Sequence, residues 1–516
     1  LPVAGQDVGV SFAGARYTLN VGAPPPALKS LTVRNEKAGQ TATVRLACAV
    51  EQPGGFPATV GEGGVLEIGN GGSLTLTDPS PDALMALETG GEVRLTGDGK
   101  LYLKATKWKR QMLRSRGGKV ALADDATLCV LPKGEGESNA LSFFGDGDFR
   151  FAGRATLTCA TPDGTRATAD GFYAVAQTGA VTSRMEFVEA ATFGPGQSPA
   201  SFMHLGASAG HVQVLRLASD AVHCLPSQLI VGIGAGEGVL DIEAGTVRGG
   251  WYGLAIAGLY TADASFALTP RGTMRMSGGT LRLATGLAGN PWPLGLVVGD
   301  GAFCRQKNAD GTFAGGDFRG LVEMTGGAIV GEGANTACAL GVGFATGRIR
   351  QSGGTVTLKR TEKRCAAFVG LCGGTGEWAL SGGAVDISGF AYVGGVTTNE
   401  VGVYSASSPL DKFVSLIGER LGQARGTLRL TGGTFKVGKD LVLSGDGTGA
   451  LELGPDAALA VGGRLDARAG SKLVVDVRGY TGHSRTLATF VGGTATAFDE
   501  ANVALLQDRP SGYRLD

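Results

Sequence analysis

The residues from Cys338 to Ile387 nearly repeat themselves, and this near-repeat constrains the fold more than any other feature of the sequence. A Val-Gly pair recurs after 27 residues, from Gly343 to Gly370, and a Gly-Gly pair recurs after 29, from Gly354 to Gly383. A fixed period in this range is typical of solenoids, in which each repeat stacks on its neighbour. The sequence therefore predicts an array of stacked coils.

Apolar and polar residues alternate along each coil, which predicts parallel strands with one face inward and one face outward. Counted from the Gly-Gly turns, Arg275, Arg350 and Arg429 share one outward position, and their neighbours are mostly apolar. Trp378 falls on the inward face and is expected in the core. Gln351 also points inward, and we expect its amide to be hydrogen-bonded because an unpaired buried amide costs about 1 to 3 kcal/mol.

The spacing of these signatures divides the chain into three expected parts. Residues 1–59 are predicted to form an N-terminal β-rich cap, and residues 60–469 the β-helix. Residues 470–516 are predicted to form a C-terminal β cap, because an uncovered last coil would recruit other chains.

Three segments interrupt the period and are expected to be insertions: 104–119, 305–317 and 397–424. The third contains apolar residues at helical spacing, which predicts a short amphipathic helix. These residues are Phe413, Leu416, Ile417 and Leu421.

Composition narrows the class of protein. The chain contains 89 glycines in 516 residues without a Gly-x-y period, which excludes collagen. Lys plus Arg and Asp plus Glu are equal at 46 each, so no global field favours nucleic acid or an anionic membrane. No apolar run approaches the roughly 20 residues of a spanning helix. We expect an exported protein that is not membrane-spanning, has lost its signal segment and has no nucleic-acid partner.

Two groups of residues are candidates for ligand binding. Lys107, Trp108, Lys109 and Arg110 lie in a basic run that could bind an acidic polysaccharide, with the indole as a stacking platform. The alternative is a solvated helix or loop that bulges from a coil. Trp251 and Tyr252, together with Trp292, are candidates for a carbohydrate-binding surface, and the alternative is that they fill the core.

Cysteines and histidines give weaker signals. Cys338 and Cys365 each lie five residues before a Val-Gly glycine, so we expect them to stack on adjacent coils, either as a disulfide or as two buried thiols. His204, His211 and His223 fall within 20 residues, but their spacing matches no metal-binding pattern. We therefore predict no metal site and no cofactor.

The segment Leu428-Arg-Leu-Thr-Gly-Gly-Thr-Phe-Lys-Val and the segment that starts at Leu441 resemble the autotransporter-associated β-strand repeats of bacterial surface proteins. The segment Leu473-Val-Val-Asp-Val-Arg-Gly-Tyr-Thr-Gly resembles the end of such passengers. The resemblance covers about residues 228–516 and implies an all-β fold: a right-handed single-stranded parallel β-helix that is secreted or lies at the cell surface. The handedness agrees with the rule for parallel crossovers. No series of roughly ten-residue membrane strands follows, so we expect no self-secreting barrel in this chain.

Three functions remain open. The favoured one is a non-catalytic structural or adhesive surface protein, whose partner would be an extracellular polysaccharide or another surface protein, with self-association also open. A polysaccharide lyase or glycosidase is the second, since parallel β-helices host both, and Asp146 and Asp148 are the nearest local carboxylate pair. Such alternating residues usually form plain turns, so no catalytic residue is assigned. A carbohydrate-binding module is the third.

Overall fold

The computed structural model describes most of the chain, and its regular elements are all strands. The described residues are 3–12, 16–52, 57–77, 84–104, 112–131, 141–143, 147–158, 174–176, 182–194, 202–206, 209–225, 228–249, 253–258, 269–283, 295–301, 317–332, 337–343, 345–359, 367–396, 424–444, 447–478, 480, 484–496 and 502–506. They form two compact units. Unit 1 comprises Leu1–Leu229 and Gly236–Gly250, and unit 2 comprises Ile230–Ala235 and Trp251–Asp516. Strand β24 (Gln228–Ile233) crosses this division.

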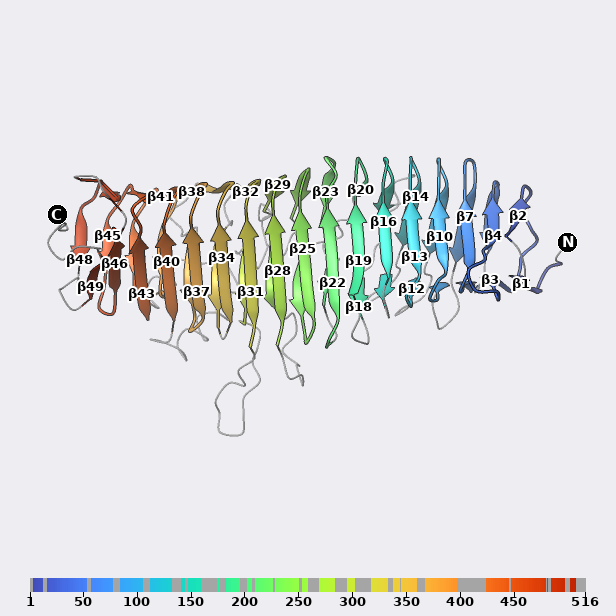
Figure 1. The fold of residues 1–516 in the computed structure, drawn as a ribbon, viewed down its shortest axis with the longest axis horizontal. Helices are drawn as coiled ribbons and strands as arrows, with labels where there is room; N and C mark the ends of the chain where they lie inside the picture. The colour runs from blue at the N-terminus through green and yellow to red at the C-terminus, as the bar shows by residue number, and fades with distance from the viewer. Residues whose placement is uncertain are drawn as a thin grey trace, which may run out of the picture. The chain divides into compact units, whose positions relative to one another are not determined.

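Unit 1 consists of three ladders of parallel strands, which successive strands of the chain join in turn (Figure 1). The first ladder contains β1 (Asp7–Phe12), β3 (Ser30–Asn35), β6 (Ala58–Val60), β9 (Met85–Leu87), β12 (Leu113–Ser115), β15 (Leu141–Phe143) and β18 (Ala174–Ala176), with β21 (Phe202–Leu205) beside β18. The second contains β2 (Tyr17–Val21), β4 (Ala42–Leu46), β7 (Gly64–Ile68), β10 (Glu92–Leu95), β13 (Lys119–Leu122), β16 (Asp148–Phe151), β19 (Thr182–Phe187), β22 (Val212–Leu217) and β25 (Glu237–Ile242). The third contains β5 (Ala49–Gln52), β8 (Ser73–Thr77), β11 (Lys100–Lys104), β14 (Thr127–Leu131), β17 (Thr156–Thr158) and β20 (Thr192–Phe193), followed by the parallel pair β23 (Val222–Cys224) and β26 (Thr246–Arg248).

Unit 2 repeats this plan. Its first ladder contains β27 (Gly253–Gly258), β30 (Leu296–Asp300), β33 (Cys338–Val342), β36 (Ala367–Leu371), β39 (Ala391–Val393), β42 (Leu441–Leu443), β45 (Leu465–Ala467) and β48 (Thr494–Thr496). Its second contains β28 (Arg271–Met276), β31 (Arg319–Met324), β34 (Thr346–Gln351), β37 (Thr375–Leu380), β40 (Arg425–Leu430), β43 (Thr448–Leu453), β46 (Lys472–Asp476) and β49 (Val503–Leu506). Its third contains β29 (Thr280–Arg282), β32 (Ala328–Glu332), β35 (Thr355–Lys359), β38 (Ala384–Ile387), β41 (Thr434–Val437), β44 (Ala458–Val461) and β47 (Ala488–Phe490). The predicted fold class, an all-β parallel β-helix, is confirmed, with three strands in each coil.

Inward side chains fill the space between the ladders. In unit 1, Phe151 and Phe187 stack with ring centroids 4.6 Å apart. In unit 2, Trp378 is fully buried and meets Phe435 edge to face at 5.5 Å, so its predicted place in the core is confirmed. The inward Gln351 donates from Nε2 to the carbonyls of Gly354 at 3.2 Å and Ala384 at 3.3 Å, as expected, whereas its buried Oε1 has no hydrogen-bond partner among the described residues.

The corner between the first and second ladders of unit 2 has a left-handed residue in the coils of β27, β30, β33, β36, β39 and β42. The residue at this corner has a φ of +63° at Gly341 and +79° at Gly370, and non-glycine residues adopt it at Ala257 and Ser444. Val342 lies opposite Leu371, so Gly341 is the partner of Gly370. The alignment of Gly343 with Gly370 was therefore wrong by two residues.

The strands continue through the predicted cap boundaries. β3 pairs with β6 across residue 59, and β43 pairs with β46 across residue 470, each in the ladder that runs on beyond it. The assignment of 1–59 and 470–516 as caps stays a prediction.

The insertions fall largely outside the described residues. Of the segment 104–119, residues 105–111 lie outside the described residues, and β12, which begins at Leu113, belongs to the first ladder. The assignment of this segment as an insertion stays a prediction. Of 305–317 only Asp317 is described, and of 397–424 only Ala424, so the predicted helix lies outside the described residues.

Candidate functional site

The aromatic and basic residues proposed as ligand contacts lie outside the described part of the chain. Lys107, Trp108, Lys109 and Arg110 belong to residues 105–111, and Trp251 and Tyr252 belong to residues 250–252. Their roles in binding stay predictions. Asp146 is also outside the described residues, whereas Asp148 is exposed at the start of β16.

Cys338 does not lie in the register expected for stacking on Cys365. It is buried in β33 opposite Ala367, and it is a free cysteine. Cys365 itself lies outside the described residues. The error follows from the two-residue misalignment of the first ladder. Burial raises the pKa of the Cys338 thiol to about 12, so this thiol stays protonated and is a poor nucleophile.

Among the described residues of unit 1, two buried serine–histidine contacts occur. The Ser183 hydroxyl lies 2.9 Å from His211 Nε2, and the Ser219 hydroxyl lies 3.0 Å from His223 Nε2. Ser219 also donates to the carbonyl of Ala191 at 2.6 Å, so its hydroxyl must accept from the imidazole. The Ser219–His223 pair therefore has the polarity of a structural contact, because a nucleophilic serine would donate to its histidine.

Metal-binding side chains do not gather in the part of the chain that the structure describes, where no three His, Cys, Asp or Glu residues form a group suited to an ion. His204 is desolvated, which lowers its pKa to about 4, so it is neutral at physiological pH.

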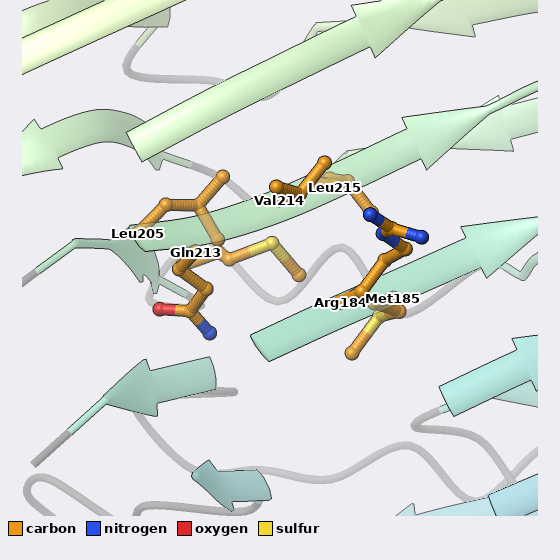
Figure 2. A pocket seen from close by; sticks show the side chains of 7 residues that line it. Arg184, Met185, Leu205, Gln213, Val214 and Leu215 are labelled. Atoms are coloured by element: carbon orange, nitrogen blue, oxygen red, sulfur yellow. The ribbon is translucent and has the colours of Figure 1, made fainter. Parts of the chain in front are cut away.

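A narrow pocket opens between β19, β21 and β22 of unit 1 (Figure 2). It is too narrow to hold a water molecule, and its lining is mainly aliphatic and thioether side chains. Gln213 and Arg184 are the polar residues in its wall. This pocket offers a substrate neither room nor a pair of carboxylates. Its lining residues are Arg184, Met185, Met203, Leu205, Gln213, Val214 and Leu215.

The outer face of the second ladder in unit 2, from β28 to β43, carries an excess of positively charged side chains. We call it the arginine face. Outward positions on these six strands hold seven arginines and three glutamates. They are Arg271, Arg275, Arg319, Arg348, Arg350, Arg425 and Arg429, with Glu323, Glu377 and Glu452.

Ion pairs across neighbouring coils use some of these charges. Glu323 lies between Arg275 at 3.9 Å and Arg350 at 3.8 Å. Glu377 lies between Arg348 at 3.3 Å and Arg429 at 3.2 Å. Glu323 and Glu377 are each shared by two arginines. The arginines therefore outnumber the glutamates, and the face keeps a net positive charge. Arg429 also pairs with Glu452, which holds the pKa of the Arg429 guanidinium above its usual range.

A second column of the same face lies at the beginning of the strands. Arg319 pairs with Asp317 at 2.6 Å, and its side chain is still 61% exposed. Arg271 and Arg425 are exposed and make no ion pair with a described residue. Hydroxyl side chains occupy the other coils of this column, which reads Arg271, Arg319, Thr346, Thr375, Arg425 and Thr448.

The corresponding face of unit 1, from β4 to β25, is electrically balanced. Its outward positions hold six basic and six acidic residues. They are Arg45, Arg94, Lys119, Arg150, Arg184 and Arg216, with Glu67, Glu92, Asp148, Glu186, Glu237 and Asp241. The excess of positive charge is therefore specific to unit 2 and does not follow from the coil geometry.

Part of the arginine face was predicted from the sequence. Arg275, Arg350 and Arg429 were expected to point outward in one column, and the register and their exposure confirm this. The column that contains Arg271, Arg319 and Arg425 was missed. A signal for it exists, because each of these arginines precedes an inward glycine at the start of its strand.

Comparisons with known proteins add little. No family model matches the sequence, and no curated protein matches it. One similar solved structure is described as a TibC-catalysed, hyper-glycosylated fragment of TibA, with 11% identity over 96% of this chain and 99% of that chain and a TM-score of 0.20. The fold assignment therefore depends on the strand ladders. The described residues include no helix that is long and apolar enough to cross a membrane.

Proposed function

We propose that this chain is a non-catalytic secreted or cell-surface β-helix protein with a structural or adhesive role. The observation that carries the proposal is the regular stacking of strands in both units, which presents long ladders of exposed side chains around a filled interior. Repeat proteins of this kind commonly use extended surfaces for binding.

The described residues also supply no specific support for catalysis. Both described serine–histidine contacts are buried, the Ser219–His223 contact has structural polarity, and the pocket of unit 1 is too small for a substrate. On the outer face of the second ladder of unit 2, charged side chains instead pair across neighbouring coils and form columns along the stacking direction. Columns of this kind suit a large partner that contacts several coils at once.

The test compares producing cells with and without the gene. Protease added outside intact cells should cut the chain, and deletion should lower attachment to polysaccharide-coated surfaces until the gene is restored. Purified protein should leave the same polysaccharides at their original length. Protection from external protease, or shortening of a polysaccharide by the purified protein, would overturn the proposal.

A further inference from the structure

We propose that the arginine face of unit 2 binds an acidic polysaccharide whose chain runs along the stacking direction of the coils. This inference rests on the proposed surface role and adds the chemical class of the partner. The face carries seven arginines against three glutamates, whereas its counterpart in unit 1 carries six charges of each sign.

The column at the beginning of the strands is the centre of the proposed site. Arg271 and Arg319 are on adjacent coils, and Arg425 is three coils beyond Arg319. Adjacent strands are about 4.8 Å apart, so the six coils of the face span about 24 Å. A planar guanidinium presents two parallel donors to a carboxylate or sulfate. Arg271 and Arg425 keep these donors available because no described residue pairs with them.

Residues between the arginines suit a sugar chain. Thr346 and Thr375 separate Arg319 from Arg425 in the column, and Thr448 follows on the next coil. Their hydroxyls can exchange hydrogen bonds with sugar hydroxyls. At the next outward position along the strands, short side chains stand beside Arg271, Arg425 and Thr448, so a polymer can approach the sheet closely at these coils. These short residues are Thr273, Thr427 and Ala450, whereas Leu321, Arg348 and Glu377 occupy the three coils between.

Nucleic acid is less well matched by the same surface. Single strands are held by aromatic side chains on which the bases stack. The outward positions of β28 to β43 contain no aromatic residue among those described. The surface thus offers charge and hydroxyl groups without stacking platforms, which favours a carbohydrate polyanion.

Carboxylates that already pair with the arginines define what the ligand must displace. Glu323 and Glu377 each pair with two arginines of the face, and Glu452 pairs with one. In the column at the beginning of the strands, Asp317 pairs with Arg319. In this column an incoming anionic group therefore competes with Asp317 at Arg319, while Arg271 and Arg425 have no ion-pair partner in the part of the chain that the structure describes. Binding should weaken with salt because these contacts are exposed.

The test measures binding of the full chain to polygalacturonate and to dextran sulfate by biolayer interferometry, with neutral dextran and single-stranded DNA as comparisons. The variant R271Q/R319Q/R425Q should bind both acidic polysaccharides about tenfold more weakly than the unmodified chain, since each exposed pair contributes modestly. The matched control K119Q/R150Q/R184Q removes the same charge from the balanced face of unit 1 and should change affinity by less than about twofold.

Three results would overturn the proposal: no binding of either acidic polysaccharide by the unmodified chain, equal losses in the two triple variants, or tighter binding of DNA than of the polysaccharides. Circular dichroism of both variants establishes that each is folded. The cell-attachment test is independent of these results. If attachment depends on the gene while polysaccharide binding fails, only the assignment of the arginine face is wrong.

Discussion

Some glycines at the corners of unit 2 are required because there is no space for a side chain. At Gly376 an added Cβ would lie 2.2 Å from the amide nitrogen of Gly370 and 2.6 Å from the carbonyl oxygen of Leu340. At Gly347 it would lie 1.8 Å from the carbonyl oxygen of Val298. Glycine is required here because two turns of backbone approach each other, independently of its own φ.

We therefore expect Gly376→Ala to destabilise unit 2 by about 1 to 3 kcal/mol, the usual range for overpacking. Denaturant unfolding followed by circular dichroism would measure this loss. The exposed neighbour provides the control, since Thr375→Ala should change stability by no more than about 0.5 kcal/mol. Equal stability of the two variants would contradict the close approach of the backbones.

A second residue-scale prediction concerns pH. Burial lowers the pKa of His204 to about 4, below the ordinary value of 6.5. The unfolded chain therefore binds a proton at this site before the folded chain does, and stability falls as the pH drops from about 6.5 to about 4. It is unaffected above that window. The expected loss is on the order of 1 to 3 kcal/mol.

Denaturation midpoints of the unmodified chain and of His204→Gln between about pH 7.5 and pH 4 would check this window. The variant should show a shallower decline, because it lacks the titrating ring. Burial also lowers the pKa of His223, so both proteins should lose some stability in acid. Parallel curves for the two proteins would show that His204 titrates normally in the folded state.

The ladders of unit 2 differ in how well the sequence predicts their register. For the second ladder, the predicted alignment of Arg275, Arg350 and Arg429 is correct. For the first ladder it is shifted by two residues, which moved the expected partner of Cys338 from Ala367 to Cys365. The Gly-Gly turns that follow the second ladder have constant length, so counting residues back from them gives the correct register. The connections that lead to the first ladder vary in length, so counting across them gives a wrong register.

Whole-molecule behaviour should follow from the local nature of the contacts. In a stacked array each coil contacts its neighbours, so a defect weakens the coils around it more than distant ones. Both units have their own ladders and their own aromatic core groups, Trp378 with Phe435 in unit 2 and Phe151 with Phe187 in unit 1.

We expect Trp378→Ala to cost about 3 to 5 kcal/mol and to reduce amide protection in β34, β37 and β40 while β7, β10 and β13 keep theirs. Hydrogen exchange followed by mass spectrometry would map the change. In the converse experiment, Phe187→Ala should affect β16, β19 and β22 and spare unit 2. Uniform loss of protection along the chain after either substitution would show that the two units unfold as one.

The sequence by itself determined the parallel β-helix, the inward and outward faces of its second ladder and the burial of Trp378. It could do so because alternation of apolar residues and the fixed length of the Gly-Gly turn are local properties. Only the tertiary structure decided the register of the first ladder, the division into two units and the contrast between the balanced face of unit 1 and the arginine face of unit 2. These depend on which residues of separate coils lie opposite one another. That pairing cannot be predicted by counting residues along the sequence, because the connections between strands vary in length.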